Sequence, residues 1–165
     1  MRTSFTYLLA ACLVGCSVPA AASDSQADRV TLTGLTPISV VLEELPPIAQ
    51  RNGLTSAALQ SDVERRLRQA GISITPDADA YLYVHVTIAD PGGRLPLPYF
   101  VDVSLMQEVT LPRGVRTRTP LQCPTWNLTS LGMVSGTGLR MAIGDRVAQF
   151  VDQFIVAYRS VNPKP

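Results

Sequence analysis

The sequence is poor in residues that form metal and disulfide sites. It has one histidine and three cysteines, with no Cys-x-x-Cys or His-x-His spacing, which excludes the usual zinc sites. Asp77 and Asp79 carry carboxylates that calcium accepts, but the spacing and late glutamate of an EF-hand are missing. We interpret these two residues as part of a turn. The sequence therefore predicts no metal and no cofactor.

A surplus of positive charge is also absent. The chain has 14 basic and 13 acidic residues, and removal of a leader that contains Arg2 would leave 13 of each sign. Nucleic-acid binding requires a basic surface, so we expect no nucleic-acid partner. With 46% hydrophobic and only 16% charged residues, the chain is too apolar to be disordered.

The N-terminal apolar run, Phe5–Val14, is too short to span a bilayer. It follows Arg2 and precedes small residues, so residues 1–22 read as a signal peptide. Leu13-Val14-Gly15-Cys16 resembles the lipobox of bacterial lipoproteins, which predicts lipidation at Cys16, whereas Ala20-Ala21-Ala22 fits ordinary signal cleavage. We therefore expect either an outer-membrane lipoprotein that faces the periplasm or a soluble periplasmic protein, with residues 23–33 as a tether before one domain over residues 34–165.

No internal disulfide can form in the exported chain. Cys12 lies in the leader, Cys16 is lipidated or removed, and Cys123 is then alone. Stability must therefore come from the hydrophobic core, although an oxidising compartment would permit disulfides.

Hydrophobic periodicity predicts an α+β fold. The expected segments are a strand at Ile38–Leu45, a helix from Thr55 to Ala70, a short strand at Ile72–Thr75, alternating strands at Ala80–Ala89 and Tyr99–Leu111, a strand within Leu121–Val134 and a helix from Leu139 to Tyr158. The main elements follow the order β-α-β-β-β-α. This order predicts a two-layer α/β sandwich, with a mostly antiparallel sheet and both helices on the face that carries Val84 and Val101. The face to which Trp126 belongs is left open.

Several short motifs are shared with known proteins. Gly53-Leu54-Thr55, the run Val63–Ile72, Thr125-Trp126 and the closing Tyr158–Pro163 resemble a widespread group of small exported bacterial proteins of unknown function. That resemblance spans nearly the whole mature chain and implies no active-site residues. The element order is also similar to that of the lipopolysaccharide-assembly lipoprotein and of the N-terminal domain of the Tol-Pal β-propeller protein, an analogy of fold alone.

The two alternating strands bring polar residues together on the outer face of the sheet. If Val84 and Val103 share the core face, His85 falls opposite or diagonal to Asp102 or Ser104. A small periplasmic hydrolase that uses Ser104, His85 and Asp102 is therefore the alternative hypothesis. A flat sheet face provides no oxyanion hole, and the chain has no Gly-x-Ser-x-Gly nucleophile elbow, so catalysis is not expected.

The same outer face is our first candidate for a binding surface. It combines aromatic and polar side chains, a mixture common at protein contacts, although aromatic residues also favour strands for their own sake. A basic loop follows, which would meet anionic lipid head groups or be a solvated hairpin tip. The candidate partner-binding residues are Tyr81, Tyr83, His85, Phe100, Asp102, Met106, Arg113, Arg116 and Arg118. We expect an exported cell-envelope accessory domain that binds a protein or lipid partner, reaches the membrane through a lipid anchor if Cys16 is modified, and could form a homodimer through an open sheet edge.

Overall fold

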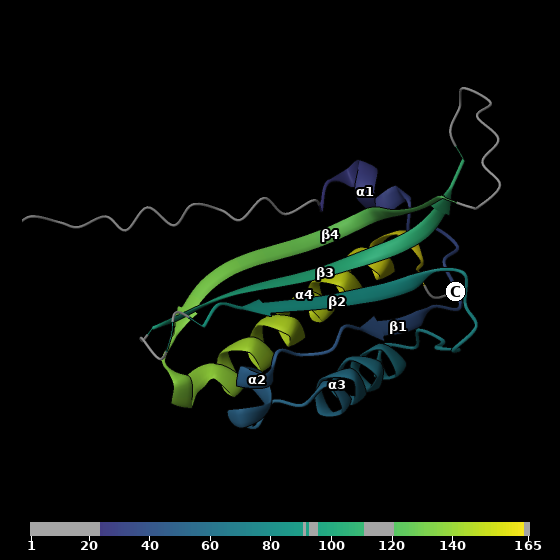
Figure 1. Cartoon of the computed structure of the whole chain (residues 1–165). Coiled ribbons are helices and arrows are strands. Elements are labelled where there is room, and N and C mark those ends of the chain that lie inside the picture. Colours follow the sequence, from purple (N-terminus) through teal and green to yellow (C-terminus); the bar gives the residue numbers. More distant parts are fainter. Residues whose placement is uncertain (1–23, 91, 93–95, 111–120, 164–165) are drawn as a thin grey trace, which may run out of the picture.

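A four-stranded sheet in the order β1-β2-β3-β4 organises the chain (Figure 1). This computed structural model describes residues 24–90, 92, 96–110 and 121–163. The strands are β1 (Ser39–Leu42), β2 (Tyr81–Ile88), β3 (Leu97–Val109) and β4 (Leu121–Val134). β1 runs parallel to β2, and the other two pairs are antiparallel. The predicted fold class, an α+β two-layer sandwich with a mostly antiparallel sheet, is confirmed.

Two long helices cover one face of the sheet (Figure 1). α3 (Ser56–Gln69) begins after Thr55, whose side chain accepts a hydrogen bond from the backbone of Ala58. This is an ordinary N-cap. α4 (Leu139–Val161) has 23 residues and buries a stripe at helical spacing from Leu139 to Ala157. Both helices occur where the apolar periodicity predicts them, because each must bury one stripe against the sheet.

The segment predicted as a tether differs in the structure. α1 (Gln26–Val30) is a short helix with a capping box between Ser25 and Asp28, and Leu32 just after it is fully buried. The side chain of Asn162 accepts a hydrogen bond from the backbone of Gly34 at 2.7 Å and donates one to the carbonyl of Leu32 at 2.8 Å. The tether prediction is therefore wrong for residues 24–33, because contacts with the far end of the chain hold this polar segment in place.

Two smaller differences concern the region around β1. A short helix, α2 (Pro47–Arg51), follows β1 and begins at a proline, a residue suited to the first turn of a helix. Ile72–Thr75 was expected to be a strand, but it makes a single parallel bridge between Ile38 and Ile74. The backbone hydrogen bonds from Ile38 to Ser73 and from Thr75 to Ile38 form this bridge, and Pro76, which has no N–H to donate, follows it.

Trp126 lies in the core. Its ring meets the edge of Phe154 of α4 at 5.2 Å between centroids, and its exposed fraction is 1%. A register shift places Leu105 opposite Trp126 and Met106 opposite Pro124, so Thr125 is an extra residue in β4. This bulge changes the alternation of β4, which is why a simple period of two did not assign Trp126 to a face.

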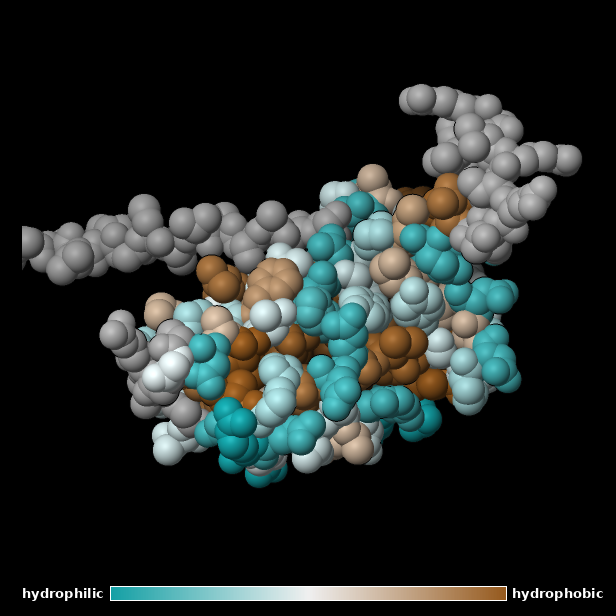
Figure 2. All heavy atoms as spheres, in the orientation of Figure 1, coloured by the Kyte–Doolittle hydropathy of each residue, from teal (hydrophilic) through white to brown (hydrophobic). Residues whose placement is uncertain are grey.

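Apolar residues also reach the surface on the side where α2 and α3 lie. Figure 2 shows them in a band across the middle of this side, where β1 and the start of α4 lie in Figure 1. Within the described residues, no helix has the length and apolarity needed to cross a bilayer.

Candidate functional site

The outer face of the sheet, which α3 and α4 leave uncovered, consists of side-chain rows that run across the strands. One row joins Thr87, Phe100 and Leu131, and the next joins His85, Asp102 and Thr129. A third row joins Tyr83 to Ser104. Val84 and Val103 pair on the core side as predicted, and His85 lies directly opposite Asp102, one of the positions that the alternation allows. The outer face therefore changes from apolar to polar over neighbouring rows.

A hydrogen-bonded cluster lies at the polar part of this face. The hydroxyl of Tyr83 donates a hydrogen bond to a carboxylate oxygen of Glu43, and the other carboxylate oxygen of Glu43 lies 3.3 Å from Nε2 of His85. The same nitrogen lies 3.1 Å from the hydroxyl of Thr87. The hydrogen bond to Glu43, together with desolvation, raises the pKa of Tyr83 to about 12. This cluster presents both donors and acceptors at the surface.

The three residues of the hydrolase hypothesis share the face but do not form a triad. Ser104 is only 5% exposed, and its hydroxyl donates to Asp102. A serine nucleophile must instead give its proton to a histidine that a carboxylate orients. Here the ring of His85 contacts Glu43 and Thr87, so the arrangement needed for acyl transfer is not assembled.

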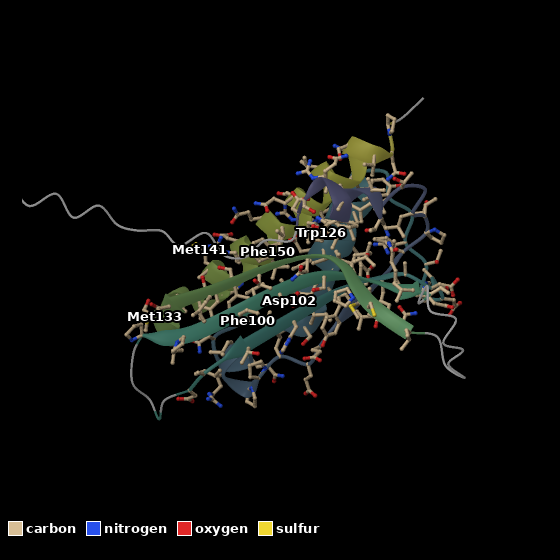
Figure 3. The ribbon with its side chains drawn as sticks, turned by 90° about the horizontal axis from the view of Figure 1, so that it is seen from above. Phe100, Asp102, Trp126, Met133, Met141 and Phe150 are labelled. Atoms are coloured by element: carbon tan, nitrogen blue, oxygen red, sulfur yellow. The ribbon has the colours of Figure 1, made fainter. Side chains whose placement is uncertain are left out.

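The end of the outer face near the start of α4 is apolar. Leu131 is 77% exposed and Met133 is 66% exposed, and their partners on β3 are Phe100 and Pro98. Figure 3 shows Met133 near one end of the sheet, with Phe100 and Asp102 farther along it. Exposed apolar side chains that gather in this way mark contact surfaces.

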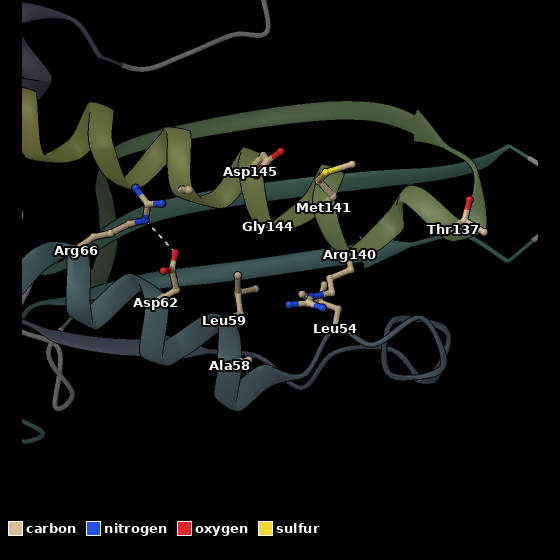
Figure 4. A pocket seen from close by; sticks show the side chains of 11 residues that line it. Leu54, Ala58, Leu59, Asp62, Arg66, Thr137, Arg140, Met141, Gly144 and Asp145 are labelled. Carbon is tan, nitrogen blue, oxygen red and sulfur yellow. Dashed lines mark hydrogen bonds and ion pairs between the residues drawn. The ribbon is translucent and has the colours of Figure 1, made fainter.

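The helical side carries a groove between α3 and α4 (Figure 4). Its volume is about 630 Å³, and Leu54 and Leu59 form its buried floor. Arg66 donates to Asp62 at 2.9 Å and to Asp152 of α4 at 3.1 Å, so it joins the two helices across the groove. The remaining lining residues are Ala58, Thr137, Arg140, Met141, Gly144, Asp145 and Ala148. The charged residues of the lining, two aspartates and two arginines, balance in sign.

Four predicted site residues fall outside the part of the chain that the structure describes: Cys16, Arg113, Arg116 and Arg118. The other candidates, Tyr81, Tyr83, His85, Phe100, Asp102 and Met106, all lie on the outer rows of β2 and β3. Among the described residues, no group of three or more histidine, cysteine, aspartate or glutamate side chains is arranged to hold a metal ion.

Sequence reasoning missed three contributors to the outer face. Glu43 lies in the expected first strand, but only the parallel pairing of β1 with β2 brings it to Tyr83 and His85. Leu131 and Met133 lie in β4, whose faces a simple alternation does not assign. Their alternation with the buried Leu128 and Ser130 is the signal that locates them, once the bulge at Thr125 is known.

No protein-family model matches the chain, and no curated protein sequence is significantly similar to it. The chain is similar to a solved structure of a minor lipoprotein from Acinetobacter baumannii, with 16% sequence identity and a TM-score of 0.34. The similarity covers 73% of this chain and 92% of the lipoprotein chain. At this level the similarity supports no inference about fold or function.

Proposed function

We propose that this chain is an exported cell-envelope accessory domain that binds a protein partner through the outer face of its sheet. The observation that carries the proposal is the composition of that face, which neither long helix covers. The face combines the Tyr83, Glu43 and His85 cluster with the apolar row of Phe100 and Leu131. The export part of the proposal rests on the signal peptide that the sequence predicts over residues 1–22.

A protein partner suits these residues better than a lipid surface. The apolar row would supply buried contact area, and the tyrosine, carboxylate and imidazole groups beside it would form directional hydrogen bonds. This combination of an apolar centre with polar surroundings is typical of protein interfaces. Lipid head groups would instead be attracted by Arg113, Arg116 and Arg118, which we propose as a secondary membrane contact.

Lipidation at Cys16 would keep the domain close to a membrane. Residues 17–23 separate Cys16 from Asp24, and seven residues of fully extended chain reach at most about 25 Å. Because residues 24–33 pack against the domain and do not act as a tether, this connection is shorter than the composition suggests. The domain would then meet its partner at the membrane surface.

The proposal is tested by replacing Tyr83 and Phe100 together with serine in the chain expressed with its leader in its native host. Met141→Ser on α4 is the matched control, because Met141 is 68% exposed and belongs to the helical side. We expect the double variant to lose envelope proteins that co-purify with the wild type and the control to retain them. Circular dichroism checks that both variants fold. Unchanged co-purification by a folded double variant would contradict the proposal.

A further inference from the structure

The two edges of the sheet differ in how they are protected. β1 forms one edge and has only four residues, and two acidic residues and two prolines soon follow it. Short strands, charges and prolines are the features that keep an edge from pairing with another chain. β4 forms the other edge and has 14 residues, more than twice the usual strand length. Among the described residues, its ladder partner is β3 alone.

The features that keep β4 from pairing with another chain lie in its first half. Pro124 and the bulge at Thr125 interrupt it, and the segment after α1 lies beside it. There the hydroxyl of Thr31 lies 3.4 Å from the carbonyl oxygen of Thr125. Asp24 accepts a hydrogen bond from the indole of Trp126 at 3.0 Å. Figure 1 shows α1 next to this strand.

Within the part of the chain that the structure describes, the second half of β4, Asn127–Val134, has none of these features. No residue of β4 is charged and none of this half is proline. Its outer side carries Leu131 and Met133, which are among the most exposed large apolar residues of the described chain. A long, uncharged edge with exposed apolar side chains is the kind of strand that pairs with another strand.

We propose that Asn127–Val134 pairs antiparallel with the same segment of a second copy, so that two four-stranded sheets become one continuous sheet. A two-fold axis places the same segment of each copy opposite itself. Self-pairing in this arrangement normally suffers when like charges meet across the strands, and a strand without charges avoids this cost. The same neutrality leaves no charge pattern that would select a different protein.

The side chains favour a register centred on Leu131. In this register Leu131 faces Leu131 of the second copy, and Met133 faces Thr129. On the inner side, Gly132 faces Ser130. Both exposed apolar residues are then covered across the new strand pair. This inference shares Leu131 with the face of the proposed function, but it concerns the edge of the sheet and needs neither Tyr83 nor His85.

The first test is the molar mass of the full chain, expressed with its leader and measured by sedimentation equilibrium over a range of concentrations. We expect twice the mass of one chain for the wild type and the mass of a single chain for Leu131→Lys, which would bring two positive charges together. Val156→Lys on α4 is the matched control, because Val156 is 61% exposed, and it should keep the doubled mass. A wild type with the mass of one chain at every concentration would overturn the proposal, as would a doubled mass that survives Leu131→Lys.

The second test reads the register. Directly opposed residues have Cβ atoms about 4.5–5.5 Å apart, and small movements bring such a pair within reach of a disulfide. In a Cys123→Ser background, Leu131→Cys should give a disulfide-linked dimer under mild oxidation, and Val156→Cys should not. Equal crosslinking of the two variants would overturn the pairing at β4. If the wild type has the mass of one chain and still binds its partner, this inference fails and the proposed function stands.

Discussion

Replacing Asp24 with alanine should destabilise the domain, because this carboxylate fastens α1 to the core. It accepts hydrogen bonds from Arg29 at 2.8 and 2.6 Å and from the indole N–H of Trp126 at 3.0 Å. Trp126 is 1% exposed, so alanine would leave a buried donor without a partner, at a cost of about 1–3 kcal/mol. The ion pair with Arg29 is partly exposed, so solvent screens it and it adds less than the buried hydrogen bond.

We therefore expect Asp24→Ala to lower the free energy of unfolding by about 2 kcal/mol. This corresponds to roughly 4–8 °C in the melting temperature of a domain of this size. Asp24→Asn keeps a carbonyl acceptor for Trp126 but loses the charge, so its loss should stay below about 1 kcal/mol. The assay is guanidinium unfolding followed by tryptophan fluorescence, for which Trp126 is the only tryptophan in the chain.

The effect of Asp24→Ala should also depend on pH. The hydrogen bond from Arg29, more than that from Trp126, lowers the pKa of Asp24 below its ordinary value of 3.8. A carboxylate whose pKa is lower in the folded state stabilises the fold above the unfolded pKa and loses that effect as the pH falls through the folded pKa. The difference between wild type and variant should thus be full at pH 7 and shrink below about pH 4. Asp77→Ala in an exposed turn is the control, and an Asp24→Ala midpoint equal to that of this control would refute the reasoning.

Two further substitutions test the sheet. Gly132→Ala should cost about 1–3 kcal/mol, because a Cβ there would lie 2.5 Å from the ring of Tyr99. Gly144→Ala is the control, because nothing lies within 4 Å of the carbon added there. Thermal unfolding should show a lower melting temperature only for Gly132→Ala, and equal melting temperatures of the two variants would contradict the packing. In an alkaline absorbance titration, Glu43→Gln should lower the pKa of Tyr83 from about 12 toward that of a free tyrosine. Because the folded pKa is the higher one, the stability that this contact provides is full below about pH 10 and is lost as the pH rises through the folded pKa; a titration that Glu43→Gln leaves unchanged would refute the contact.

The hairpin of β2 and β3 could be predicted because the residues of each strand alone determine which face is buried. Alternation of apolar and polar residues assigns each strand a core face. Once Val84 and Val103 share that face, the positions of His85 and Asp102 follow from the period of two. The two long helices were predictable for the same reason, since each buries a continuous apolar stripe.

The position of α1 depends on long-range contacts and was missed. Its residues are polar and have no helical stripe, and the contacts that hold the segment come from Trp126 and Asn162, far along the chain. The capping-box pattern of Ser25 and Asp28 is the local signal that would have indicated a helix there.

The candidate site was predictable only in part. Tyr83, His85 and Phe100 were placed on the outer face by alternation, but Glu43 reaches it through parallel pairing between strands separated by α3. Periodicity gives the face of a residue and not its neighbouring strand. Ser104 and Asp102 lie two residues apart on β3, so periodicity places them side by side. It does not say which neighbour the Ser104 hydroxyl bonds, and its hydrogen bond to Asp102 leaves the predicted triad unassembled.

Site-specific photo-crosslinking in the native host tests most directly whether the outer sheet face binds a protein. A photoreactive amino acid is placed at His85 or Phe100 on that face, and at Val156 on α4 as the control, in the chain expressed with its leader. The account predicts that both sheet positions crosslink to the same envelope protein, identified by mass spectrometry, and that Val156 does not. Crosslinks from Val156 alone, or none from either sheet position, would contradict it.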